Sequence, residues 1–469
     1  MLTVTAPTQV KPFLDYTLSI VFDEWLGQEY RVEYKDCDRV IISLDNHSQS
    51  IQIQTNFIIE LECNEISAFD FSDHQVECLF LKSLELGLEE QSGFKDKNDI
   101  PVMFGSPNLK IGSNIKIDFD LFGTIFFMLS RFEELVSPER DQHDRFPAKA
   151  SLAYKYGFLE RPIVDEYVEL LWACMTKLWP ELQRKERTPK IFVSCDADTP
   201  FDPTVKTLPR LLRTCAADLL KRKSVTEALK RIQRYHFNKK GDFRFDPNYT
   251  FDWYMDVCEQ NGLKAAFYFI PESIEPGNGD YSLKDKDIRE LLIKIDERGH
   301  EIGVHGSYQT YQDGTKLKKQ KALLEGTLRE LGIGQKIKGN RQHYLRWDSS
   351  ITPDLLDDAG FEYDTTGGYA DHAGFRFGTC HEFSMWSWQK QEKLRLKQRP
   401  LVVMECTVID DRYMDLGVTE EALKFMHRMK TTCYQVNGDF ALLWHNSSLS
   451  SIDIKNGFFS VLNATLRGV

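Results

Sequence analysis

The pattern of apolar and polar positions in the first part of the chain alternates with a period of two. Segments such as YRVEY (30–34), VIISL (40–44) and SIQIQTNFII (50–59) alternate or carry β-branched runs between polar turns, which is typical of strands. Apolar residues then recur at helical spacing over 119–136 and 161–179. A polar segment follows, so we expect a smaller, strand-rich α+β domain with two helices and a linker at residues 1–188.

From Lys190 onward the pattern changes to strands that alternate with helices. Helical spacing covers 252–262, 285–299 and 420–430. Alternation of this kind predicts an α/β domain with a mainly parallel sheet or a barrel, at residues 189–469. The predicted strands are KIFVS (190–194), KAAFYFI (264–270), HEIGVHG (300–306), KIKGNR (336–341), LVVMEC (401–406) and DFALLWH (439–445).

Two carboxylates end the first of these strands. Side chains alternate along an extended strand, so Asp196 and Asp198 point to the same side. Two carboxylates there repel each other unless a cation lies between them or one stays protonated. A metal ligand beside a general base meets that condition, whereas an Asx-turn opening a loop is the structural alternative.

Polar side chains also end three later strands. His305 lies at the exit of the HEIGVHG strand, where a neutral imidazole could bind a metal. Arg341 and His343 follow the next predicted strand, and the rigid guanidinium fork of an arginine suits a carboxylate such as Asp196. His445 ends the last strand and could act as a general acid. A structural role in a hydrogen-bonded core is the alternative for each histidine.

Composition narrows the class of protein. The chain has 469 residues and a net charge of −12, which argues against a nucleic-acid partner, because such proteins need a basic footprint. Ten cysteines are scattered with no C-x-x-C pair, as in a reducing cytoplasm. The N-terminus lacks the features of a signal peptide, and no apolar run reaches the ~20 residues of a membrane span. We therefore expect a cytoplasmic protein without a membrane span.

One basic stretch, residues 221–240, stands out from this acidic background. Ser224 and Glu227 match a capping box, so a helix is expected to begin there. A solvated amphipathic helix is the favoured interpretation, and a rim that attracts an anionic substrate is the alternative.

Taken in order, four segments resemble the motifs of the metal-dependent polysaccharide deacetylases, the NodB-homology carbohydrate esterases. They are SCDAD (194–198), GHEIGVHGSYQ (299–309), GNRQHYLRW (339–347) and LLWH (442–445), and the resemblance spans roughly residues 190–450. GYADHAGFRFGTC (368–380) and the N-terminal domain are similar to a bacterial subgroup of that family. The resemblance implies a distorted (β/α) barrel as the fold of the C-terminal domain.

The same resemblance implies roles for individual residues. Asp196 matches the catalytic base, Arg341 the arginine that orients it, and His445 the general acid. Asp198 and His305 match two metal ligands. Gln309 stands where the family has its second metal histidine, and an amide oxygen is a poorer zinc ligand than imidazole. His343 is the nearest other candidate for a third ligand.

The expected activity is therefore removal of an N- or O-acetyl group from a sugar or polysaccharide precursor. The expected cofactor is a divalent metal, most readily zinc, with cobalt, nickel or manganese as alternatives, and a site without a metal is the remaining alternative given Gln309. The expected substrate is an acetylated sugar, either lipid-linked or a nucleotide sugar. Two alternatives stay open: a catalytically impaired barrel that acts as a carbohydrate-binding or scaffold protein in polysaccharide assembly, and a C–N hydrolase acting on a small non-sugar amide.

Overall fold

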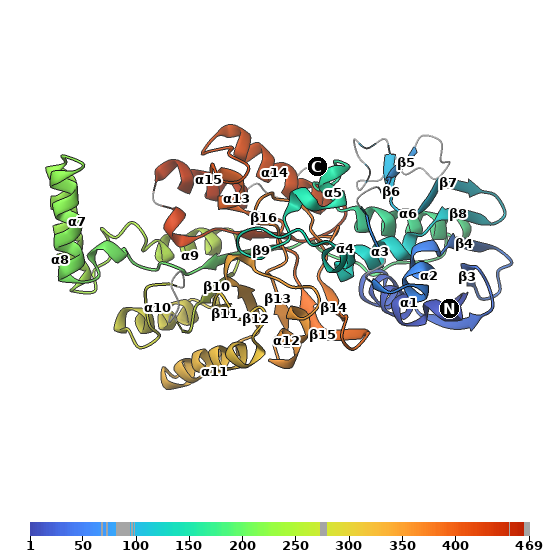
Figure 1. Cartoon of the computed structure of the whole chain (residues 1–469), viewed down its shortest axis with the longest axis horizontal. Coiled ribbons are helices and arrows are strands. Elements are labelled where there is room, and N and C mark those ends of the chain that lie inside the picture. The colour runs from blue at the N-terminus through green and yellow to red at the C-terminus, as the bar shows by residue number, and fades with distance from the viewer. Residues whose placement is uncertain are drawn as a thin grey trace. The chain divides into compact units, whose positions relative to one another are not determined.

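The chain is divided into two compact units. A computed structural model describes residues 1–66, 69–71, 74–80, 94, 97, 99–272, 279–449 and 451–463 (Figure 1). The first unit comprises Met1–Lys190, Leu345–Val403 and Arg428–Ala441, and the second comprises Ile191–Tyr344, Met404–His427 and Leu442–Val469. The first unit thus takes in two segments from the C-terminal half, and the predicted domain division at residue 188 stays a prediction.

The first unit contains a six-stranded sheet in the order β2-β1-β3-β4-β8-β7. The alternating segments predicted as strands form most of β2 and β3 and all of β4, because one face of each alternation can be buried, as in β3. Residues 55–59 were predicted to continue the third strand and are not part of it. Helix α2 (Asn56–Cys63) begins there and buries Phe57, Ile58 and Leu61 at helical spacing. The strands are β1 Leu2–Pro7, β2 Tyr30–Lys35, β3 Arg39–Leu44, β4 Ser50–Gln54, β7 Gly105–Ile111 and β8 Ile115–Phe119, with β5 Glu77–Phe80 and β6 Asp99–Val102 paired separately.

Helices pack beside this sheet. Helix α3 is buried along its whole length, and Asp120 accepts a hydrogen bond from the Gly123 N–H to cap its first turn. Helix α6 begins directly after Pro162, in the segment where apolar residues at helical spacing predict a helix. The helices of this part of the chain are α1 Lys11–Leu18, α2 Asn56–Cys63, α3 Leu121–Ser130, α4 Phe132–Val136, α5 Leu152–Lys155 and α6 Ile163–Leu178.

The larger sheet has nine strands in the order β14-β15-β13-β12-β11-β10-β9-β17-β16. This mixed α/β sheet is open, since β14 and β16 are its edges, and among the described strands it does not close into the predicted barrel. Strands β13 and β16 are only two residues long, and β14 pairs with β15 in an antiparallel hairpin. Few backbone groups are therefore available for the hydrogen bonds that would close the sheet into a barrel. The strands are β9 Ile191–Asp196, β10 Ala265–Phe269, β11 Glu301–Gly306, β12 Gly339–Gln342, β13 Tyr363–Asp364, β14 Phe383–Ser387, β15 Glu392–Gln398, β16 Val403–Met404 and β17 Phe440–Leu443.

In the second unit, β9, β10, β11 and β12 run parallel. Every residue of β10 is buried, as expected for a central strand covered on both faces. Gly303 in β11 is required, because a Cβ there would lie 2.5 Å from the Tyr268 ring. The carboxyl ends of these strands meet at one edge of the sheet, which brings together the polar residues that end them.

The remaining helices lie along the second half of the chain. None of the described helices combines the length and apolar character needed to cross a membrane. Helices α7 and α8 form a separate hairpin, drawn in green in Figure 1. The bounds are α7 Leu208–Leu220, α8 Val225–Asn238, α9 Phe251–Gln260, α10 Lys286–Glu297, α11 Gly314–Glu330, α12 Thr352–Asp358, α13 Glu405–Ile409, α14 Glu420–Gln435 and α15 Ile452–Asn463.

Candidate active site

The two aspartates at the end of β9 differ in their surroundings. Asp196 is the last residue of the strand and is only 3% exposed. Its Oδ1 is buried and has no hydrogen-bond partner within the described residues. Asp198 follows in the loop, where its Oδ1 faces two imidazole rings. A buried carboxylate oxygen without a partner is expensive unless a ligand binds it, so this end of β9 is built to receive one.

Asp198, His305 and His343 converge on one point. Asp198 Oδ1 lies 3.1 Å from His305 Nε2 and 3.4 Å from His343 Nδ1, and the two nitrogens are 2.9 Å apart. Ligand bonds of 2.0–2.1 Å in a tetrahedral zinc site separate neighbouring ligand atoms by about 3.3 Å. The three atoms therefore have the separations and the donor types of a divalent metal site.

The tautomer of His305 supports this arrangement. His305 Nδ1 lies 2.8 Å from the carbonyl oxygen of Arg341, which can only accept, so Nδ1 carries the proton and donates it. Nε2 is then the nitrogen that faces Asp198 Oδ1, at 3.1 Å. A carbonyl that fixes a histidine in this way is the usual support of a metal-binding imidazole.

The structure places the two candidates for a third ligand differently. Gln309, the residue that the resemblance indicates, is exposed in the turn that follows β11. His343, directly after β12, lies close to Asp198 and His305. Tyr344 next to it has φ 61° and ψ 13°, a left-handed conformation that is uncommon for a residue with a large side chain. This turn directs the chain so that the His343 ring reaches Asp198.

The side chain of Arg341 lies next to the carboxylate of Asp196. It is fully buried, and its Nη2 donates to Ser194 Oγ at 2.8 Å while Nη1 lies 4.0 Å from Asp196 Oδ2. Its guanidinium lies over the Tyr268 ring, 5.4 Å from the centroid. The arginine predicted to face Asp196 is thus adjacent to that carboxylate.

His445 reaches the same site from the end of β17. Its Nε2 lies 3.8 Å from Asp198 Oδ2. Its Nδ1 donates to Glu405 Oε1 at 2.8 Å, and the same oxygen accepts from the His445 N–H at 3.0 Å and from Ser448 Oγ at 2.8 Å. Glu405 was predicted to lie in a strand, but it begins helix α13. Its closeness to His445 could not be read from the sequence, since forty residues separate the two.

Burial and neighbouring charges shift the pKa of Asp198 and of His445 in this cluster. Burial opposes ionisation of Asp198, but the charges of His343 and His305 outweigh it and hold the pKa of Asp198 well below its usual value. Burial lowers the pKa of His445, whereas the carboxylate of Glu405 and then the two aspartates raise it to about 10. The imidazole of His445 is therefore protonated on both nitrogens at neutral pH.

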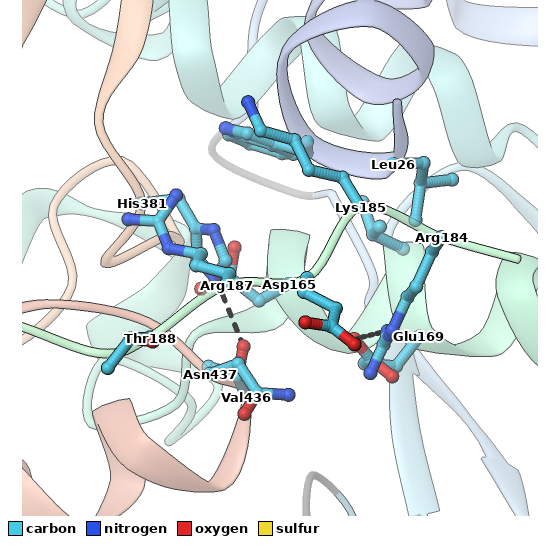
Figure 2. A pocket seen from close by; sticks show the side chains of 13 residues that line it. Leu26, Asp165, Glu169, Arg184, Lys185, Arg187, Thr188, His381, Val436 and Asn437 are labelled. Carbon is cyan, nitrogen blue, oxygen red and sulfur yellow. Dashed lines mark hydrogen bonds and ion pairs between the residues drawn. The ribbon is translucent and has the colours of Figure 1, made fainter. Parts of the chain in front are cut away.

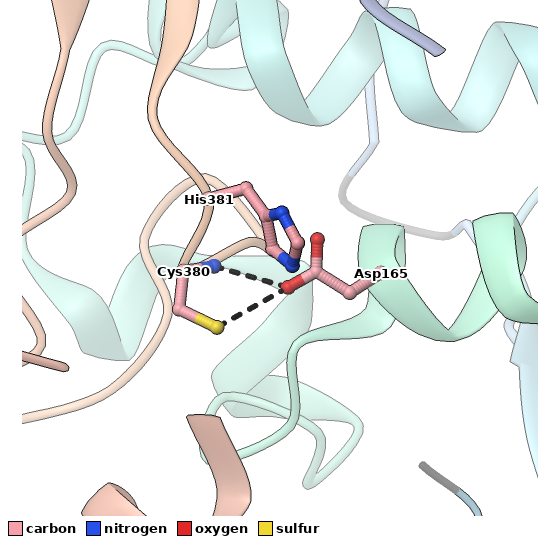
Figure 3. Close-up of side chains that lie close together, drawn as sticks. All are labelled: Asp165, Cys380 and His381. Atoms are coloured by element: carbon pink, nitrogen blue, oxygen red, sulfur yellow. Dashed lines mark hydrogen bonds between the residues drawn. The ribbon is translucent and has the colours of Figure 1, made fainter. Parts of the chain in front are cut away.

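A second cluster of possible ligands lies in the first unit, where Asp165, Cys380 and His381 are close together (Figure 3). Most of its possible ligand atoms already have hydrogen-bond partners, although the buried His381 Nδ1 has none among the described residues. Asp165 accepts from Thr379 Oγ1 at 2.6 Å and from the Cys380 N–H at 3.1 Å, and His381 Nε2 donates to the Val436 carbonyl at 3.0 Å. This network joins helix α6 to the segment before β14.

A cavity of about 340 Å³ lies beside that cluster (Figure 2). Burial and then the positive charge of Arg187 lower the pKa of His381 to about 3. The positive charge of Arg187 next to His381 would repel a metal cation at this cluster. Arg184 on the same cavity is paired with Glu169 at 2.6 Å. We therefore interpret the cluster of Asp165, Cys380 and His381 as structural.

Comparisons with known proteins cover different parts of the chain. Residues 2–180 match the model of DUF7033, a family of unknown function. No curated protein matches the chain. Among solved structures, it is similar to a protein described as a polysaccharide deacetylase from Mycobacterium smegmatis, with 16% identity and a TM-score of 0.38 over 60% of this chain and 86% of that one.

Two further solved structures are similar at the same low level. A protein described as a polysaccharide deacetylase from Pseudomonas aeruginosa PAO1 has 11% identity and a TM-score of 0.34, over 59% of this chain and 84% of that one. Puue allantoinase has 12% identity and a TM-score of 0.30, over 45% of this chain and 63% of that one. The chain is thus distantly similar to described deacetylases and to an allantoinase.

Proposed function

We propose that the second unit is a metal-assisted hydrolase that removes an N- or O-acetyl group from a sugar or polysaccharide precursor. The observation that carries this proposal is the convergence of Asp198 Oδ1, His305 Nε2 and His343 Nδ1 beside the buried carboxylate of Asp196. The sequence resemblance to polysaccharide deacetylases supplies the substrate class.

Asp198, His305 and His343 would hold the cation, most readily zinc. A divalent ion bound there would polarise the acetyl carbonyl and lower the pKa of a water molecule. The Arg341 carbonyl accepts from His305 Nδ1, so Nε2 is the nitrogen turned towards the proposed metal position. The fully buried Arg341 side chain lies beside Asp196, with Nη1 4.0 Å from Asp196 Oδ2.

Asp196 is the proposed general base and His445 the proposed general acid. As the water oxygen bonds to the acetyl carbon, Asp196 takes its proton at Oδ1, the oxygen that has no hydrogen-bond partner among the described residues. The C–N or C–O bond then breaks, and His445 donates the proton on Nε2 to the leaving nitrogen or oxygen. Acetate and the free amine or alcohol are the products. Glu405 positions His445 through Nδ1 and keeps it charged.

Acetate release from acetylated amino sugars tests the activity. We expect release by the wild-type protein, loss with a chelator and recovery on adding zinc. Asp196→Asn should lower kcat by about 100-fold or more, the contribution of a general base. Asp256→Asn, an exposed change in α9 of the same unit, should leave kcat unchanged and serves as the matched control.

Two outcomes would contradict the proposal. If no acetylated sugar is hydrolysed while a small non-sugar amide is, the substrate class is wrong and the C–N hydrolase alternative holds. If Asp196→Asn binds sugar as tightly as the wild type and neither protein hydrolyses anything, the scaffold alternative holds. Lipid-linked and nucleotide sugars are compared as substrates in the same assay.

Glu405 has a separate readout as a positioning residue. Because its carboxylate raises the pKa of His445, Glu405→Gln should move the basic limb of the kcat profile to lower pH. A merely structural role would lower the amount of folded enzyme without moving that limb.

A further inference from the structure

Helices α7 and α8 form an antiparallel hairpin that stands apart from the sheet of the second unit (Figure 1). Little apolar surface holds the two helices together, since Leu211 and Ala228 are the buried apolar residues among the described positions of the pair. An ion pair between Asp218 of α7 and Arg231 of α8 also joins the two helices. The buried Asp218 binds Arg222 and Arg231, and Arg231 Nη1 also donates to Thr204 Oγ1 at 2.7 Å.

Large apolar side chains are instead turned outward on this hairpin. They repeat at i, i+4 and i+11 along α7 and at i, i+4 and i+7 along α8, so each helix carries one apolar stripe. These side chains are between 47% and 80% exposed. They are Leu208, Leu212, Leu219 and, at the end of the helix, Leu220 of α7, and Val225, Leu229 and Ile232 of α8.

The two stripes lie on the same side of the hairpin. Leu211 and Asp218 mark the side of α7 that faces α8, and Ala228 and Arg231 mark the facing side of α8. With a rotation of about 100° per residue, the apolar stripe of each helix lies roughly 90° from the side that faces the other helix, counted in the direction of the chain. Because the helices are antiparallel, these equal rotations point the same way, and the stripes form one continuous apolar face.

The hairpin is also strongly basic. Residues 207–240 contain ten lysines and arginines against two carboxylates, a net charge of +8, although the whole chain carries −12. All other residues together therefore carry −20. By helical rotation Arg213 and Lys230 fall on the outer sides of the two helices, next to the apolar face. Lys221, Arg222 and Lys223 lie in or beside the connection between the helices.

We propose that the α7–α8 hairpin, residues 207–240, binds the surface of an anionic lipid bilayer. The apolar face enters the boundary between headgroups and acyl chains, and the basic side chains beside it bind anionic headgroups. A second copy of the chain is a poorer occupant, because two hairpins with a net charge of +8 each would repel one another. The inference rests on the hairpin alone and does not depend on the proposed hydrolase activity.

Co-sedimentation of the full chain with vesicles tests this proposal. We expect binding to phosphatidylcholine vesicles that contain about one third phosphatidylglycerol and little binding to phosphatidylcholine alone. The double variant Leu212→Gln and Leu229→Gln should weaken binding by at least about tenfold, since it removes two apolar anchors. Both side chains are exposed, so the fold should tolerate the change.

Matched variants separate the two contributions. Leu323→Gln, an exposed leucine on α11 of the same unit, should bind vesicles like the wild type. Arg213→Gln with Lys230→Gln should weaken binding and make it less sensitive to salt. Equal binding to neutral and anionic vesicles would overturn the electrostatic part of the proposal.

Two further results would overturn the proposal as a whole. One is the absence of vesicle binding together with concentration-dependent dimers that the Leu212→Gln and Leu229→Gln variant lacks, which would assign the face to a second copy. The other is a monomer that binds no vesicle of either composition, which would leave the hairpin to an acidic protein partner.

Discussion

Replacement of His343 is the sharpest test of the metal site, because the sequence resemblance points to Gln309 and the structure to His343. His343 Nδ1 lies 3.4 Å from Asp198 Oδ1 and 2.9 Å from His305 Nε2, whereas Gln309 is exposed in a turn. Structural zinc sites with four ligands bind with about 10–16 kcal/mol, or about 3 kcal/mol per ligand. Since about 1.4 kcal/mol is a factor of ten, His343→Ala should weaken zinc binding by about 100-fold or more.

Competition with a chromophoric chelator measures the zinc affinity, and the absorption bands of bound cobalt report the ligand set. Gln309→Ala is the matched control and should change the affinity by less than about twofold. Circular dichroism of both variants checks that the fold is kept. The opposite pattern, in which Gln309→Ala loses the metal and His343→Ala keeps it, would refute the reasoning.

Three further predictions concern stability. The pKa of His381 is lowered to about 3 in the folded protein. Below about pH 6.5 the unfolded chain therefore binds a proton at His381 that the folded chain does not bind. The free energy of unfolding should fall as the pH drops from about 6.5 towards 3. His381→Gln should reduce that slope by about one proton in urea unfolding, and an unchanged slope would contradict it. Gly438→Ala should destabilise by about 1–3 kcal/mol, because its Cβ would lie 2.1 Å from Cys380 Sγ, whereas Gly326→Ala in open space on α11 should stabilise slightly. Ser224 accepts from the Glu227 N–H at 3.2 Å, so Ser224→Ala should speed hydrogen exchange in α8, with about 1 kcal/mol lost.

The sequence predicts those features of the second unit that depend on local pattern. The alternation of apolar runs and helical spacing locates β9 to β12 and helix α10 to within a few residues. The helix start predicted at Ser224 is confirmed, since that side chain accepts from the Glu227 N–H. The second bond of the capping box is not formed, because the Ser224 N–H donates to the Asp218 carbonyl. The segment 401–406 was predicted as a strand, but only two of its residues form β16, and a helix begins at Glu405.

The site shows the same division between local and long-range information. Asp196 and Asp198 could be placed on one side of a strand end, because period-two alternation is a local property. The turn after β12 depends on a left-handed Tyr344, which no sequence rule signals in a residue other than glycine, asparagine or aspartate. The contact between Glu405 and His445 joins residues forty positions apart, so it depends on the tertiary fold.

The left-handed Tyr344 sets stability and activity against each other. Its backbone costs about 1 kcal/mol relative to a glycine or asparagine in the same conformation. Its ring also packs against His343, with centroids 4.5 Å apart, and against Tyr308 at 5.6 Å. Laboratory selection for heat resistance alone would therefore tolerate Asn or Gly at this position. Such variants would lose the aromatic neighbour of His343. Proteins selected only for thermal stability should therefore lose affinity at the proposed metal site.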